Sequence, residues 1–226
     1  MSKAKLVEYK FSKSKVNYLA RHYSTKGFLA RPSNDEMLVI PETRFITAVS
    51  KLKVKLSNFL RVRKPRALTD KWILERAVFC HIETGGRYVV DFVRDTYSIP
   101  IKITDTSVLI SSRFAEAIRK KHKEFGCMID VVIFDDVFDS GKTFLKVANA
   151  LENVFYKEGV EFRLVIASVF RRRTPDHTRE DYGFSTLNTE LLPNYKLVYG
   201  ERVNSTKYLL LPWEKSKSKT KSKRKK

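Results

Sequence analysis

Three carboxylates and a Ser-Gly-Lys-Thr turn lie within residues 135–143. Asp135 and Asp136 follow an apolar run that predicts a buried strand, Asp139 comes three residues later, and the turn opens an apolar-periodic segment that predicts a helix. The start of a helix offers unpaired backbone N–H groups and a partial positive charge, both of which suit a phosphate. Carboxylates suit sugar hydroxyls or Mg²⁺ rather than bare phosphate. The spacing therefore predicts one loop for a phosphorylated sugar and a metal ion.

The same loop has two other interpretations. Gly-Lys-Thr also ends the P-loop of nucleoside triphosphatases, but that motif needs a glycine five residues before its Gly-Lys pair, where Asp136 stands. Three carboxylates would also repel a triphosphate, so the sequence argues against an ATPase of this class. In the plainer interpretation, Asp135 and Asp136 merely end a strand and Ser140 caps a helix. The combination of all these residues at this spacing favours the phosphate site.

A second candidate loop precedes the first by one strand–helix–strand unit. Residues 77–82 predict a buried strand, residues 88–97 an amphipathic helix and residues 99–103 another strand. Glu83-Thr84-Gly85-Gly86 lies between the first strand and the helix. Glycines in such a loop let backbone N–H groups approach an anion closely. The loop is therefore a candidate for a second anionic group.

These segments resemble the type I phosphoribosyltransferase family. The acidic loop is similar to the family's motif for 5-phosphoribosyl-1-pyrophosphate (PRPP): a hydrophobic strand, two acids, two apolar residues and Asp-Ser/Thr-Gly-x-Thr. The Gly-Gly loop resembles the family's pyrophosphate-binding loop. Residues 207–214, Lys-Tyr-Leu-Leu-Leu-Pro-Trp-Glu, resemble the closing strand of the 6-oxopurine (hypoxanthine, guanine, xanthine) enzymes. The three segments together span residues 77–214.

The resemblance implies transfer of a 5-phosphoribosyl group from PRPP to a nucleobase nitrogen with release of pyrophosphate, and 6-oxopurine salvage in particular. It implies that Asp135 and Asp136 hold the ribose hydroxyls, partly through Mg²⁺, and that Asp139 hydrogen-bonds or deprotonates the base. The implied binding residues are Ser140, Gly141, Lys142 and Thr143 for the 5′-phosphate, Glu83, Thr84, Gly85, Gly86 and Arg87 for pyrophosphate, and Arg172, Tyr208 and Leu209 for the base.

Three features depart from the family pattern. Arg172 stands nearest to the place where 6-oxopurine enzymes have a base-reading lysine. The loop that closes over PRPP should lie between Thr104 and Lys123, where residues 111–113, Ser-Ser-Arg, replace the usual Ser-Tyr. Glu83 puts a negative charge near the expected pyrophosphate site. Two functions therefore stay open: an active phosphoribosyltransferase, or a regulatory protein of the same fold that binds PRPP or a nucleotide together with RNA or DNA.

Alternating strands and helices over residues 77–169 predict an α/β fold with a central, mostly parallel sheet flanked by helices. Both motif loops then fall at the carboxyl ends of strands, where such sheets bind ligands. The resemblance implies the type I phosphoribosyltransferase fold, with a small hood subdomain built from terminal segments. We expect a basic segment over residues 1–40 as a candidate part of the hood, a phosphoribosyltransferase domain over 41–214 and a disordered tail over 215–226.

The chain of 226 residues carries a formal net charge of +20. Eight of the last twelve residues are basic, so this tail predicts either weak, salt-dependent nucleic-acid binding or a merely solubilising terminus. The sequence contains neither an apolar run of membrane-spanning length nor a signal-peptide core, which predicts a cytoplasmic protein without membrane contact. The lack of glutamine is a mild indication of a thermophilic source. By analogy with the family, we expect a homodimer or tetramer.

Overall fold

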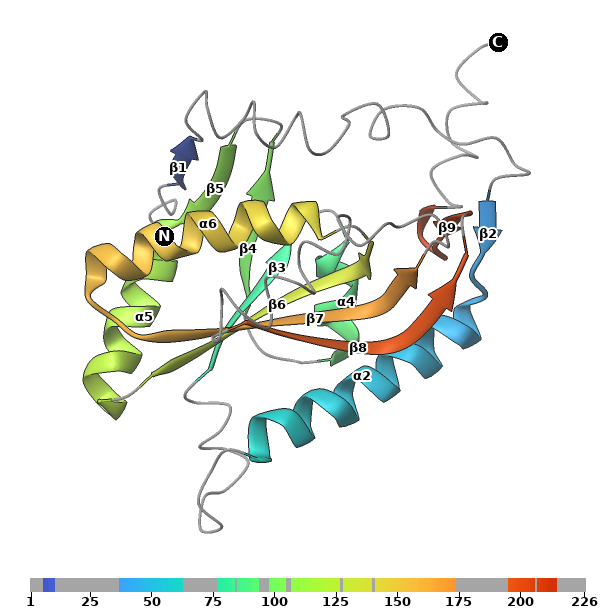
Figure 1. Cartoon of the computed structure of the whole chain (residues 1–226), viewed down its shortest axis with the longest axis horizontal. Helices are drawn as coiled ribbons and strands as arrows, with labels where there is room; N and C mark the ends of the chain where they lie inside the picture. Colours follow the sequence, from blue (N-terminus) through green and yellow to red (C-terminus); the bar gives the residue numbers. More distant parts are fainter. Residues whose placement is uncertain are drawn as a thin grey trace.

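The computed structural model describes residues 6–10, 37–62, 77–83, 85–93, 98–104, 107–126, 128–139, 141–173, 195–205 and 207–214. In this part of the chain, helices cover both faces of one large sheet (Figure 1). In chain order the elements are β1 (Leu6–Lys10), β2 (Met37–Val39), α2 (Glu42–Val62), β3 (Ala77–Ile82), α4 (Gly86–Val93), β4 (Ile99–Ile103), β5 (Ser107–Ser111), α5 (Ser112–Phe125), β6 (Ile129–Phe138), α6 (Lys142–Glu158), β7 (Phe162–Arg173), β8 (Tyr195–Asn204) and β9 (Tyr208–Leu210).

The large sheet has seven strands in the order β1-β5-β4-β3-β6-β7-β8. The neighbours from β4 to β8 pair in parallel, whereas β5 and β1 continue the sheet antiparallel. This arrangement confirms the expected α/β fold with a mostly parallel sheet flanked by helices. The strands predicted over 77–82 and 99–103 are β3 and β4, and the central position of β6 brings the two motif loops to adjacent strands.

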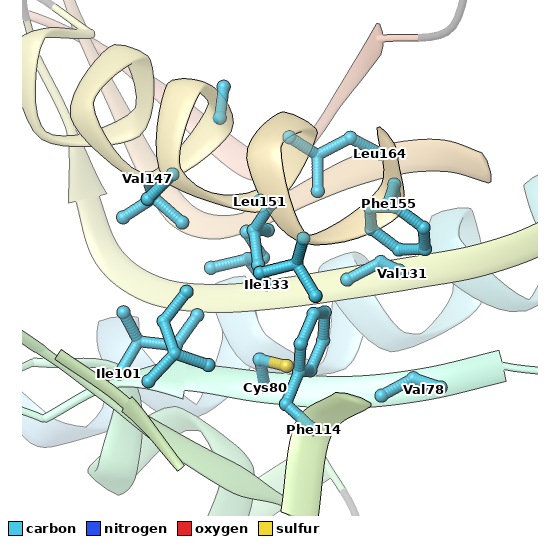
Figure 2. Close-up of a cluster of buried hydrophobic side chains, with 14 of the residues drawn as sticks. Val78, Cys80, Ile101, Phe114, Val131, Ile133, Val147, Leu151, Phe155 and Leu164 are labelled. Carbon is cyan, nitrogen blue, oxygen red and sulfur yellow. The ribbon is translucent and has the colours of Figure 1, made fainter. Parts of the chain in front are cut away.

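One face of the sheet packs against α5 and α6. Figure 2 shows Val147, Leu151 and Phe155 of α6 turned toward Val131 and Ile133 of β6. These side chains belong to one buried cluster, which explains why the apolar spacing in the sequence predicted this helix. The helix begins directly after the acidic loop, so this packing fixes where the loop ends.

The opposite face packs against α2 and α4. After Pro41 the sequence repeats apolar residues at helical spacing, and this segment forms α2, whose Leu52 and Leu56 are buried against the sheet. Gly200 of β8 allows α2 to approach closely, because a Cβ at this position would overlap the carbonyl oxygen of Ala48. The sheet therefore lies between two helical layers.

A second, two-stranded sheet pairs β2 with β9 in parallel, which joins segments from the two ends of the chain (Figure 1). The hood subdomain expected from terminal segments stays a prediction. Only Tyr208–Leu210 of the closing segment 207–214 is a strand, because a turn over residues 211–214 follows it. The rest of the expected N-terminal segment, apart from residues 6–10 and 37–40, and the tail over 215–226 lie outside the described residues.

Two other expectations need correction. Asp135 and Asp136 do not follow a strand but lie inside β6, which continues to Phe138 because Val137 and Phe138 still pair with β7. The segment between Thr104 and Lys123, where the closing loop was expected, consists mainly of β5 and most of α5, and only residues 105 and 106 lie outside the description. Of the helices described, none is both long and apolar enough to cross a membrane.

Candidate active site at the carboxyl ends of the strands

The backbone of the acid pair on β6 is bonded partly by side chains rather than by the sheet. The Asp136 N–H donates to Oδ1 of Asp135 at 3.0 Å, and the Val137 N–H donates to Oδ1 of Asp136 at 2.7 Å. Ser168 of β7 donates its hydroxyl toward the Asp136 carbonyl at 3.3 Å. The ladder with β7 pairs Asp135 with Ser168 and Val137 with Phe170, so the register is the same before and after Asp136. The two acids therefore stand next to each other inside a strand of constant register.

Asp135 is buried and Asp136 is partly buried, and this changes the proton affinity of both carboxyls. Burial, reinforced by the negative charge of Asp136, holds the pKa of Asp135 well above its usual range. Burial raises the pKa of Asp136 to about 6, against the opposing effect of its bond from Val137, and Glu214 adds a smaller increase. A cation or a pair of hydroxyl donors beside these groups would compensate the buried negative charge.

Mg²⁺ fits this pair of acids. The described residues contain no group of three or more His, Cys, Asp or Glu side chains that could enclose a metal ion. Mg²⁺ is usually bound by one or two carboxylates, substrate phosphates and water rather than by a protein cage. Asp135 and Asp136 supply that number of carboxylates, so they could hold an ion that arrives with a phosphorylated substrate.

The Gly-Gly loop lies directly against the acid pair. A Cβ on Gly85 would overlap the carboxylate of Asp136, and a Cβ on Gly86 would overlap the carbonyl oxygen of Phe134. The backbone of Glu83 continues the sheet, since its N–H donates to the Ile101 carbonyl at 3.0 Å. The structure therefore brings together two loops that the sequence identified separately. Of the expected pyrophosphate ligands, Thr84 lies outside the described residues.

Asp139 forms an ion pair with Arg172 at the end of β7. A second guanidinium nitrogen of Arg172 donates to the Lys207 carbonyl at 3.0 Å, just before β9. The remaining Nε of Arg172 is buried and has no hydrogen-bond partner among the described residues. Arg172 thus ties the third acid of the loop to the closing segment, which contains the other expected base contacts, Tyr208 and Leu209.

Tyr208 and Glu214 hold the closing turn together. The Tyr208 hydroxyl donates to Oε1 of Glu214 at 2.8 Å, and the Leu211 N–H donates to Oε2 at 2.8 Å. The Tyr208 residue is 42% exposed, so its ring is accessible to a ligand, whereas the expected base contact Leu209 is buried and can offer only its backbone. Partial burial, followed by the bond to Glu214, raises the pKa of Tyr208 above its usual range.

The expected 5′-phosphate site lies at the start of α6. Gly141 precedes this helix with a φ of 77°, a left-handed conformation that favours glycine. The N–H groups of the helix's first turn are its unpaired donors, which is the geometry required for phosphate. Thr143 lies in this turn, while Ser140 and the side chain of Lys142 lie outside the described residues.

Sequence reasoning gave no role to Glu214, Trp213 or Tyr88. The Trp213 ring stacks on Tyr88 of α4 with centroids 4.5 Å apart, and its edge meets Phe45 of α2 at 4.9 Å. The closing turn is thereby fastened to the helix that follows the Gly-Gly loop. The Pro-Trp-Glu run was visible in the sequence, but its function depends on partners that only the fold brings near.

Neither a family model nor a curated protein matches the sequence. Among solved structures, a purine phosphoribosyltransferase from Pyrococcus horikoshii is 18% identical, with 79% of this chain and 95% of that chain covered and a TM-score of 0.40. A xanthine-guanine-hypoxanthine phosphoribosyltransferase from Helicobacter pylori is 15% identical, with coverages of 82% and 97% and a TM-score of 0.42. A hypothetical protein from Neisseria gonorrhoeae with bound ppGpp is 14% identical, with coverages of 84% and 98% and a TM-score of 0.48.

Proposed function

We propose that this chain transfers a 5-phosphoribosyl group from PRPP to a nitrogen of a nucleobase and releases pyrophosphate. The observation that carries the proposal is the contact between the two motif loops, in which Gly85 lies against the carboxylate of Asp136. Backbone donors of the Gly-Gly loop and the first turn of α6 would bind the two anionic ends of PRPP. The buried acids between them would then face the ribose.

Asp135 and Asp136 would hold the ribose hydroxyls and stabilise the positive charge that develops at the anomeric carbon. Their burial suits this role, because charges interact more strongly in a site that excludes water. Asp135 and Asp136 would hold Mg²⁺, and the ion would supply positive charge that balances the charge of the departing pyrophosphate. The C1′–oxygen bond to pyrophosphate breaks while a C1′–nitrogen bond to the base forms.

Asp139, Arg172 and Tyr208 would form the base site. Asp139 would accept the proton or the hydrogen bond of a ring N–H, and the ring of Tyr208 would stack on the base. Arg172 is a hydrogen-bond donor beside Asp139. We therefore propose a 6-oxopurine rather than adenine as the base, since a 6-oxopurine carries both a ring N–H and an exocyclic oxygen that the guanidinium could bind. Uracil and orotate carry both groups as well, and against them the proposal rests on the resemblance of residues 207–214 to the closing strand of the 6-oxopurine enzymes.

The test is pyrophosphate release from PRPP and Mg²⁺ with guanine, hypoxanthine, xanthine, adenine, uracil and orotate offered in turn. We expect turnover with a 6-oxopurine and a loss of about 10²-fold or more in kcat for Asp139→Asn, which still accepts a hydrogen bond but no proton. Turnover with adenine or orotate alone would refute the choice of base. PRPP binding without pyrophosphate release in the presence of any of these bases would instead support the regulatory alternative.

A further inference from the structure

We propose that the outward surface of the second half of α2 binds nucleic acid through its phosphate backbone. This surface, the basic face, consists of the exposed side chains Ser50, Lys51, Lys53, Lys55, Ser57 and Asn58. It belongs to the helical layer that covers the face of the sheet opposite to α5 and α6 (Figure 1). The proposal is independent of the phosphoribosyl transfer described above.

After its first turn, α2 carries positive charge without an acid. Within Glu42–Val62 the acidic residue of the first turn is followed by arginines and lysines without another acid. The other described helices mix both signs: Asp91 in α4, Glu116 and Glu124 in α5, and Glu152 and Glu158 in α6. The helix α5 is also rich in lysine and arginine, but acids lie among them, whereas the second half of α2 presents a surface of one sign to a polyanion.

Residues of β7 and β8 hold Lys55 in place and add a further basic group, Arg171, beside the basic face. Nζ of Lys55 donates to the carbonyls of Tyr199 and Gly200 at 3.0 and 3.2 Å, and lies 4.8 Å from the centroid of the Tyr199 ring. Arg171 of β7 lies 5.5 Å from the centroid of the same ring. Lys55 is thus held at the edge of β8, while the exposed side chains of Lys51 and Lys53 leave their ammonium groups accessible to phosphate.

The composition of α2 favours nucleic acid over a membrane. A helix that lies on a membrane inserts its apolar side chains into the lipid, but Leu52, Leu56 and Leu60 are buried against the sheet. The outward surface instead offers Ser57 and Asn58, whose polar groups also bond to phosphate and sugar oxygens. Val54 is the exposed large apolar side chain of this half of the helix.

The basic face is separate from the candidate active site. Phe45 at the start of α2 packs near Phe170 at a ring distance of 6.3 Å, toward the carboxyl end of β7. Phe59 near the end of α2 lies 4.7 Å beneath the guanidinium of Arg163, at the amino end of the same strand. The helix therefore runs away from the acidic loop, and its second half can be altered without touching that loop.

The test compares two double variants of the full-length chain that lose the same charge. Lys51→Gln/Lys53→Gln changes the basic face, and Lys120→Gln/Lys123→Gln changes exposed lysines of α5 across the sheet. The change in fluorescence anisotropy of a labelled 20-nucleotide RNA of mixed sequence would be measured over a range of salt concentrations. Two lost phosphate contacts lower the salt slope by about 1.4 and the affinity about 25-fold at 0.1 M salt. We expect this loss for the α2 variant and little change for the α5 variant.

Three results would overturn the proposal. Equal losses in both variants would show that net charge and the shared basic tail, rather than the basic face, determine binding. Unchanged affinity of the α2 variant would exclude this surface. If the α2 variant lost its binding to vesicles of phosphatidylserine and phosphatidylcholine to the same extent as its RNA binding, the basic face would bind anionic surfaces in general instead. Phosphoribosyl transfer and urea unfolding, measured for both variants, separate these results from misfolding and from failure of the proposed enzyme activity.

Discussion

Asp136→Asn should stabilise the folded protein while it damages the candidate active site. The carboxyl of Asp136 has a pKa of about 6 in the folded chain, above its ordinary value of 3.8, chiefly because it is buried. Between these two values the unfolded chain has lost a proton that the folded chain retains, so the free energy of unfolding falls as the pH rises. The shift corresponds to about 3 kcal/mol, at about 1.4 kcal/mol for each pH unit.

The assay is urea unfolding of the wild type and the variant at each pH from 4 to 8. Asparagine keeps the oxygen that accepts the bond from Val137 and does not titrate, so the two proteins differ mainly in the buried charge. The variant's advantage should be near zero at pH 4, rise through pH 6 and then level off at about 3 kcal/mol. A difference that is constant with pH, or one that shrinks as the pH rises, would refute this account of the acid pair.

Two further substitutions test contacts around the site. Arg172→Met removes the ion pair between Arg172 and Asp139 and should lower kcat/KM for the base by about 10- to 100-fold, the effect of a lost hydrogen bond to a charged group, while PRPP binding is retained. An unchanged kcat/KM would remove Arg172 from the base site. Gly200→Ala pushes a methyl group into the carbonyl of Ala48 and should lower the free energy of unfolding in urea by about 1–3 kcal/mol without any change in kcat. Unchanged stability would contradict the close packing of α2 on β8.

The central strands and the helices that pack on them could be predicted because the apolar residues of each segment follow a single pattern. Residues 77–82 and 99–103 are apolar runs of strand length, and β3 and β4 have these bounds. The helices α2 and α6 repeat apolar residues at helical spacing, so their buried faces were also predictable. These elements lie in the interior, where side-chain chemistry follows burial closely.

The edges of the sheet were not predictable in the same way. β8 mixes buried, polar and charged residues, and it was missed because an edge strand lacks a continuous apolar signal. β5 was expected to be a mobile loop by resemblance, but Val108 and Ile110 are buried in the core and fix it as a strand. In both cases the tertiary contacts decided the structure.

The candidate site was predictable as two separate motifs but not as one arrangement. The acids and the glycines could be found by residue type and spacing, whereas the contact of Gly85 with Asp136 needs strands β3 and β6 to be neighbours. The bonds from Glu214 to Tyr208 and Leu211 depend on a turn whose conformation the sequence does not specify. Long-range pairing is the information that the local patterns lack.

The central claim is that the Gly-Gly loop and the acid pair form one PRPP site, and calorimetric titration with PRPP and Mg²⁺ tests it most directly. Gly85→Ala displaces the Asp136 carboxylate, and a shift of about 1 Å in such a site weakens function about 10²-fold. Gly159→Ala, at the far end of α6, is the matched control: an added Cβ meets no atom within 4 Å there, but the φ of 61° strains any other residue, so this variant reports the effect of a strained backbone away from the site. We predict that the wild type and Gly159→Ala bind PRPP and that Gly85→Ala binds it at least about tenfold more weakly. Equal affinities in all three proteins, or no binding by the wild type, would contradict the claim.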